Sequence, residues 1–400
     1  VERTEPVEVI IWDWPGDKDR MMIRDSFGNS VRYQIIKNER HHFFNESYWG
    51  HKYMRILVDA KVPAYGYTTY TLIEKEECTI NALPSRDPWI EGEHPYILEN
   101  DYIKVSFDTN NVSIISMVDK RSGKEIVPSN RSAGVFRLVE EDTSRGMTSW
   151  IVGRYMQVTN LNESKSVKIT DSCIDISALR QWISYNIEFG ESKLNVTVSL
   201  DYNSARLNYT IECDWQEGGK RGKYVPQLNF YMPLDYKCKS YKYDIPFGII
   251  ERDEKNMDVP GNSWMAGVPE EGNKTVMLVT DTKYGFRGYS DSLAVTLIRS
   301  SYDPDPYPEF GMHKFSFALD IVDNATNGEL IKRAFEYNHP IRYISGTVHE
   351  GTLPLEKCFI SLESDSVAIS AVKVPEDDVL MPEEEYDNKL VCDCCSTYEC

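Results

Sequence analysis

Apolar and polar residues alternate along much of the chain, which is the pattern of β-strands with one buried face. Residues 103–107 read Ile-Lys-Val-Ser-Phe, and the same alternation returns at 194–200 and 207–213, on either side of a short polar connection. These two stretches predict a hairpin of two long strands. A further strand is predicted at 315–321.

Helical patterns are scarce; the clearest covers residues 328–338 and is followed by Pro340, which suits a helix end. So many successive strands with one buried face predict an all-β protein. Large antiparallel sheets packed as a sandwich bury such faces, whereas a parallel α/β core needs alternating helices.

Changes in pattern divide the chain into three expected regions. Prolines and polar residues interrupt the strands at 83–88, so residues 1–83 are predicted to form a small β-sandwich and residues 84–340 a large one. Residues 341–400 contain short strands, then a run of acids at 376–387 and a cysteine-rich end. This last segment is too short to bury a core of its own.

Composition excludes several classes of partner. The 400 residues include 44 Lys and Arg against 63 Asp and Glu, a net charge of −19, which opposes binding to a phosphate backbone. No run of about 18 apolar residues is present to predict a membrane helix. We therefore expect neither a nucleic-acid nor a membrane partner.

Metal-binding patterns are weak. Adjacent His41 and His42 on a strand point to opposite faces, so with His51 they are a poor ligand set. Four of the nine cysteines crowd the end of the chain without the spacing of a zinc site: Cys392, Cys394, Cys395 and Cys400. We predict no metal in this chain, and cysteines without a regular pairing pattern favour a cytoplasmic location.

One strand end carries candidate binding residues. Arg299 ends the apolar run 295–298, and Asp303 and Asp305 follow on a loop with two prolines. Loops at strand ends often carry sites, and the prolines restrict the loop so that Asp305 could face a sugar hydroxyl. An ordinary turn explains the same residues. No signature of a nucleophile elbow, phosphate loop or zinc protease accompanies them.

Several motifs, in order, closely resemble the β-domains of family 38 glycoside hydrolases, which are retaining α-mannosidases. The resemblance covers about residues 7–377 and is strongest in the motifs listed next. They are Trp12-Asp13-Trp14-Pro15, the segments 96–108 and 114–125, Ile245-Pro246-Phe247-Gly248, Asp281-Thr282-Lys283-Tyr284-Gly285, Leu297-Ile298-Arg299-Ser300 and His349-Glu350-Gly351-Thr352-Leu353-Pro354.

The resemblance implies that residues 84–340 form a super-sandwich similar to galactose mutarotase. It also implies that an upstream barrel and helix bundle hold the nucleophile, the acid/base and the zinc. The chain is then the non-catalytic C-terminal half of a zinc-dependent α-mannosidase, inactive alone, which supplies scaffold and part of the cleft for mannose-containing oligosaccharides. Arg299, with Asp303 and Asp305 beside it, occupies the place of an arginine that approaches the substrate in the family.

Two other functions remain open at this point. The chain could be a free-standing carbohydrate-binding or mutarotase-like module, or its sheets could make contacts in a homo-oligomer. After residue 377 the sequence departs from the family pattern. We therefore expect the last sheet to lack its closing strand and to leave an unpaired edge.

Overall fold

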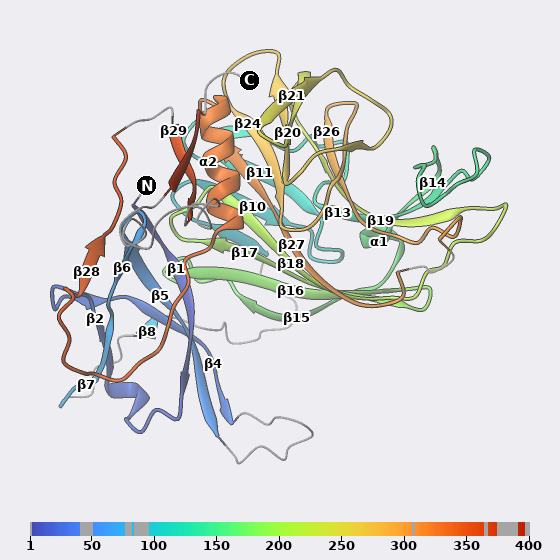
Figure 1. The fold of residues 1–400 in the computed structure, drawn as a ribbon. Helices are drawn as coiled ribbons and strands as arrows, with labels where there is room; N and C mark the ends of the chain where they lie inside the picture. Colours follow the sequence, from blue (N-terminus) through green and yellow to red (C-terminus); the bar gives the residue numbers. More distant parts are fainter. Residues whose placement is uncertain are drawn as a thin grey trace.

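The structure, a computed structural model, describes residues 2–40, 51–76, 82–83, 96–305, 309–363, 367–373 and 391–396. Nearly all of the regular structure there is β-strand, and the sheets are almost entirely antiparallel. A large sandwich and a smaller β-unit lie side by side (Figure 1). The prediction of an all-β fold with large antiparallel sheets is confirmed.

The largest sheet has nine strands within the described residues and forms one layer of the large sandwich. In spatial order they are β15 (Val167–Cys173), β16 (Arg180–Phe189), β17 (Ser192–Asp201), β18 (Arg206–Trp215), β27 (Gly311–Val322), β24 (Thr275–Thr280), β23 (Trp264–Pro269), β20 (Cys238–Ile245) and β21 (Gly248–Arg252). The predicted hairpin is β17–β18, with Leu200 opposite Leu207.

Two smaller sheets form the opposing layer. In the described part of the chain, one has six strands: β14 (Tyr155–Asn160), β13 (Val135–Glu141), β19 (Val225–Pro233), β26 (Ser292–Arg299), β25 (Gly285–Gly288) and β22 (Val259–Pro260). The other has four: β12 (Lys124–Glu125), β11 (Ile114–Asp119), β10 (Ile103–Phe107) and β9 (Ile97–Glu99). Their inward side chains form one continuous core with those of the nine-stranded sheet.

Aromatic rings from both layers meet in this core. Phe136 and Phe230 come from the six-stranded sheet, and Tyr209 and Phe317 from the nine-stranded sheet. The ring centroids of Phe230 and Phe317 are 4.5 Å apart, and Tyr209 stacks on Phe317 at 5.0 Å. In strands such as β10 and β17, every second residue contributes to this core, as the alternation predicts.

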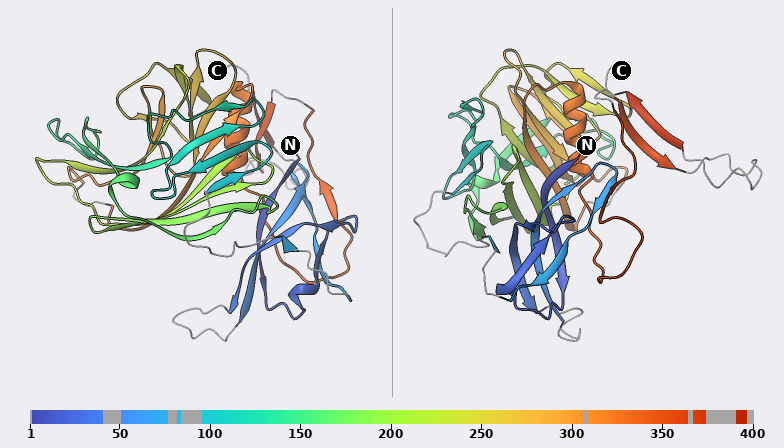
Figure 2. Two further views of the ribbon diagram at one scale, coloured as in Figure 1. Left: turned by 180° about the vertical axis from the view of Figure 1, so that it is seen from behind. Right: turned by 90° about the vertical axis from the view of Figure 1, so that its left-hand side faces the viewer.

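The outer face of the nine-stranded sheet is covered over β23, β24 and β27 by helix α2 (Asn327–Asn338), as Figures 1 and 2 show. Thr326 caps the helix by accepting a hydrogen bond from the N–H of Glu329. Ala318 and Val322, on the opposite face of β27 from Phe317, pack with Leu330 and Ala334 of the helix. A short helix, α1 (Leu161–Ser164), follows β14.

The small unit packs two sheets around their own core. Within the described residues its sheets are β1 (Arg3–Trp12), β5 (Lys52–Val62), β4 (Tyr33–Arg40) and β8 (Ala82–Leu83), and β3 (Ser30–Val31), β2 (Met21–Arg24) and β7 (Thr71–Glu74). A 3-10 turn, η1 (Lys18–Arg20), precedes β2. The unit contacts the large sandwich through the buried Gln34, whose amide exchanges two hydrogen bonds with the backbone of Arg180.

Late segments of the chain return to the small unit. Strand β28 (Glu356–Cys358) pairs with β6 (Gly66–Thr68), and the Tyr67 hydroxyl donates to the carbonyl of Pro354. The Arg3 guanidinium donates to the carbonyls of Glu336 and His339 at the end of α2. Residues near the start of the chain thus contact residues from its last third.

The end of the chain differs from the expectation. Strand β29 (Val367–Lys373) pairs antiparallel with β30 (Val391–Ser396), in the cysteine-rich segment. The expectation that the last sheet lacks its closing strand is therefore wrong on one side of β29, whereas its other edge has no partner strand among the described residues. The acidic run 376–387 lies outside the described residues.

Domain limits at 83 and 340 stay a prediction. The boundary residues 84–95 are outside the described part. Strand β28, which follows the expected boundary at residue 340, pairs with β6 in the first expected region.

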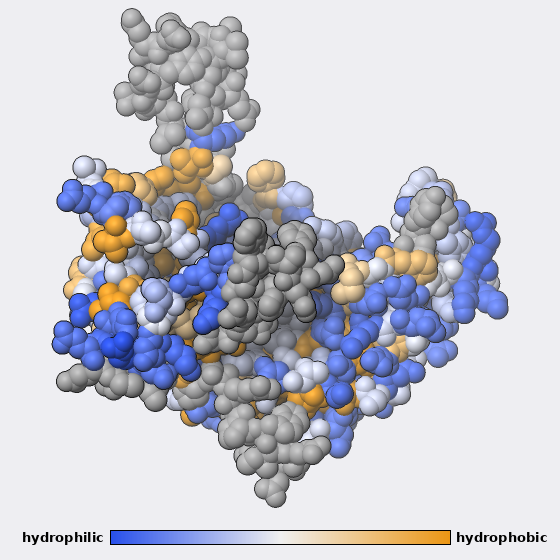
Figure 3. All heavy atoms as spheres, turned by 90° about the horizontal axis from the view of Figure 1, so that it is seen from below, coloured by the Kyte–Doolittle hydropathy of each residue, from blue (hydrophilic) through white to orange (hydrophobic). Residues whose placement is uncertain are grey.

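No helix in the described residues is long and apolar enough to cross a membrane. Seen from below, the surface is mostly polar with separate apolar areas (Figure 3).

Candidate polar site at the end of β26

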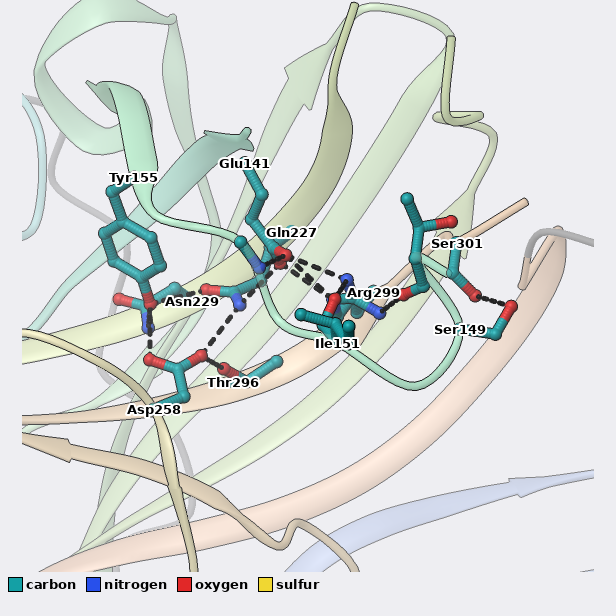
Figure 4. Close-up of polar contacts among 12 residues, drawn as sticks. Glu141, Ser149, Ile151, Tyr155, Gln227, Asn229, Asp258, Thr296, Arg299 and Ser301 are labelled. Atoms are coloured by element: carbon teal, nitrogen blue, oxygen red, sulfur yellow. Dashed lines mark hydrogen bonds and ion pairs between the residues drawn. The ribbon is translucent and has the colours of Figure 1, made fainter. Parts of the chain in front are cut away.

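Arg299, the last residue of β26, lies beneath the connection between β13 and β14 (Figure 4). The direction in which its side chain points depends on a register shift between β19 and β26. Asn229 of β19 pairs with Thr296, but Gln227 pairs with Arg299, so β26 has one extra residue here. Such a bulge re-aims the side chains that follow it. Arg299 therefore shares the outward face with Thr296, where simple alternation would separate them.

The Arg299 guanidinium is bound almost entirely by the protein. Its Nε and Nη2 donate to the carboxylate of Glu141 at 2.9–3.0 Å, a two-pronged ion pair. Nη1 donates to the carbonyl of Thr148 at 2.6 Å, and Nη2 to that of Ile151 at 3.0 Å. Glu141 is fully buried and Arg299 is 15% exposed. The arginine therefore fixes the loop 148–151 to the sheet.

Asp303 and Asp305 lie against the same loop. The N–H of Ser149 donates to the carbonyl of Asp303 at 2.7 Å, and the N–H of Asp305 donates to the hydroxyl of Ser149 at 3.2 Å. The Asp303 carboxylate accepts a hydrogen bond from the N–H of Met147 at 3.3 Å. The structure thus brings all three predicted residues together around loop 147–151. The carboxylate that binds Arg299, however, belongs to Glu141.

Asp258 organises a second part of this face. Its carboxylate accepts hydrogen bonds from the Tyr155 hydroxyl (3.0 Å), Arg287 Nε (2.7 Å), Gln227 Nε2 (3.0 Å) and the Thr296 hydroxyl (2.9 Å). Gln227 Nε2 also donates to Glu141, at 3.0 Å, and thereby links the two carboxylates (Figure 4). A continuous polar network crosses the outward face of the six-stranded sheet.

Burial is the largest cause of the pKa shifts in this network. It raises the pKa of Glu141, although the hydrogen bonds and charge of Arg299 act in the opposite direction. Burial also raises the pKa of the Tyr155 hydroxyl, and the nearby Asp258 charge adds to the rise. The same effect lowers the pKa of Arg137, whose guanidinium donates hydrogen bonds to the side-chain oxygen of Asn229, to about 10. Charged groups out of water are stable only when paired and hydrogen-bonded, which is what the network provides.

The sequence indicated Arg299, Asp303 and Asp305 but missed Glu141, Gln227 and Asp258. Glu141 ends a strand with no visible motif, and its partner lies 158 residues away. Asp258 stands in an irregular segment before β22. The one signal that the sequence offers is the isolated polar residue Gln227 within the mostly apolar strand β19.

In the described ranges, no group of three or more His, Cys, Asp and Glu side chains is placed to bind a metal ion. His51 pairs with the carboxylate of Asp13. His41 and His42 lie outside the described residues, as do the side chains of the four C-terminal cysteines. The resemblance places its zinc in the upstream barrel, so the residues around Arg299 are not the ligands that it implies. Their chemistry is that of a rigid polar support with hydrogen-bonding groups at its edge.

The comparisons with known proteins agree on one family. The model of the "Glycosyl hydrolases family 38 C-terminal domain" matches residues 98–307, just over half of the chain. Alpha-mannosidase G of Dictyostelium discoideum is 24% identical in a match 298 residues long that covers 70% of this chain and 26% of that protein. An alpha-mannosidase of Saccharomyces cerevisiae is 24% identical in a match 328 residues long that covers 76% of this chain and 29% of that protein.

A solved structure has the same fold over nearly the whole chain. It is a protein of glycosyl hydrolase family 38 from Enterococcus faecalis, with a TM-score of 0.70 and 15% identity. The match covers 94% of this chain and 49% of the other. The chain thus spans about a quarter to a half of the length of the proteins it matches.

Proposed function

The chain belongs to glycosyl hydrolase family 38, of which it carries the C-terminal domain, and on this basis we propose that it is the non-catalytic half of an α-mannosidase. Its relatives are named alpha-mannosidases. In this proposal the whole protein removes terminal α-linked mannose with retention, and groups outside the described residues supply the zinc ligands and the carboxylate pair. This half supplies scaffold and one wall of the substrate cleft.

The Arg299 site is the observation that supports a place in the cleft wall. Its guanidinium fixes loop 147–151, and that loop in turn aligns the backbone of Asp303 and Asp305. A binding wall needs groups whose positions are set before the ligand arrives, because ordering them later costs affinity. In this proposal Asp303 and Asp305 contact sugar hydroxyls, and Arg299 lies behind and beside them.

The first expected result concerns the chain by itself. Supplied with zinc, the 400-residue chain should not hydrolyse an aryl α-mannoside above the blank rate. The described residues offer no metal site, and a retaining glycosidase needs two carboxyl groups about 5–5.5 Å apart across the glycosidic bond. Turnover that co-purifies with the chain and disappears with an Arg299→Ala substitution would contradict the proposal.

In a complete α-mannosidase that contains this sequence, Arg299→Ala should raise KM or lower kcat for an aryl α-mannoside by about 10-fold or more, because a wall displaced by about 1 Å can cost 10²-fold. Arg55→Ala is the matched control, since that arginine pairs with Glu8 of β1 in the small unit, where the two side chains are 39% and 42% exposed. Wild-type kinetics for Arg299→Ala would remove the site from the cleft.

A further inference from the structure

Trp150 is an exposed aromatic residue on a loop whose backbone is fixed. Its own N–H donates to the carbonyl of Met147 at 2.9 Å, and the residues on either side are fixed by Ser149–Asp303 and Ile151–Arg299 hydrogen bonds. The Trp150 side chain is nevertheless part of a residue that is 71% exposed. The loop therefore presents a large ring to solvent from a rigid base.

Although the Trp150 ring is exposed, the loop that carries it is held by buried residues. Thr148 is 3% exposed, and its hydroxyl accepts hydrogen bonds from the N–H groups of Tyr302 and Asp303. The N–H of Gly153 donates to buried Glu141 at 3.0 Å. Because folding has already ordered this backbone, a ligand that packs on the ring loses little further loop entropy. Rigid amphipathic rings of this kind give contact area at low entropic cost.

The loop that carries the ring is bonded to a segment with hydrogen-bonding groups. The backbone of Asp303 and of Asp305 is bonded to Ser149, the residue before Trp150. An apolar surface with a few polar groups at its edge matches a pyranose, which has C–H groups on its faces and hydroxyls around its rim.

We propose that Trp150 is a stacking platform for a pyranose ring of a mannose-containing oligosaccharide, with Asp303 and Asp305 accepting hydrogen bonds from hydroxyls of the same sugar. The inference rests on the proposed function and adds to it the residue that contacts the ring face. It also assigns a role to the Arg299–Glu141 ion pair, which positions the platform and has no direct contact with the sugar face.

The test measures binding of an α-linked mannotriose to the 400-residue chain by ligand-observed saturation-transfer NMR and by calorimetry. Trp150→Ala should weaken binding about 3- to 10-fold, the effect of losing an aromatic contact, and Trp150→Phe should restore most of it. Phe27→Ala is the matched control, because Phe27 is 77% exposed on a turn of the small unit and should leave binding unchanged.

The outcomes separate this inference from the proposed function. Equal binding by wild type and Trp150→Ala overturns the platform, as does the absence of mannotriose binding by the wild-type chain. If Trp150→Ala binds normally while Arg299→Ala does not, the cleft wall stands and the platform fails. If the platform fails, the kinetics of Arg299→Ala in the complete enzyme still decide the proposed function.

Discussion

Glu141→Ala should lower the free energy of unfolding of the large sandwich by about 3–5 kcal/mol, the usual cost of removing one partner of a buried ion pair. The carboxylate of Glu141 accepts hydrogen bonds from Arg299, Gln227 and the N–H of Gly153. Its loss leaves the Arg299 guanidinium buried without a counter-charge. Urea titrations of the two chains, followed by tryptophan fluorescence, measure the difference.

Glu212→Ala is the control for this experiment. Glu212 pairs with Lys314 across β18 and β27 at 3.0 Å, but the two side chains are 51% and 73% exposed. An exposed pair of this kind contributes about 0–1 kcal/mol. If Glu141→Ala proved no more costly than Glu212→Ala, Arg299 would have another partner in solution, and its role in fixing the loop would need revision.

The second large effect is expected in the core. Phe317→Ala should destabilise the large sandwich by about 3–5 kcal/mol, because it removes a fully buried ring and leaves a cavity between the two layers. The ring contacts Phe136, Phe230 and Tyr209, so aromatic pairing is lost as well. The same urea titration gives the magnitude.

Phe335→Ala provides the comparison, because Phe335 lies on the outward side of α2 and is 48% exposed. Its removal should cost about 0.5 kcal/mol, within the range of surface substitutions. A small effect at Phe317, similar to that at Phe335, would mean that the sheets close over the vacated space, or that the two layers do not pack as described.

These two sites show what the sequence can and cannot predict. Phe317 was predictable, because alternation along 315–321 reports a buried face directly and requires no knowledge of the partner strand. The hairpin β17–β18 and helix α2 followed from equally local signals. The Glu141–Arg299 pair was not predictable, because it joins residues 158 positions apart and depends on the bulge in β26, which alternation cannot reveal.

The candidate site was predicted only in part for the same reason. Arg299, Asp303 and Asp305 are neighbours in sequence, and loop chemistry at a strand end drew attention to them. Trp150, Glu141 and Asp258 reach the same region from other segments of the chain, and only the fold brings them together. The β29–β30 pair was missed because residues 391–396, Val-Cys-Asp-Cys-Cys-Ser, show no regular alternation of apolar and polar residues.

The pairing of β6 with β28 has a consequence for synthesis. The Thr68 and Glu356 side chains that meet there are 288 residues apart, and ribosomes add about 5–20 residues per second, so the first segment waits roughly 15–60 s for its partner to emerge. During that interval the nascent small unit has an open edge, and a chaperone that covers β6 on the ribosome should raise the yield of correctly folded chain.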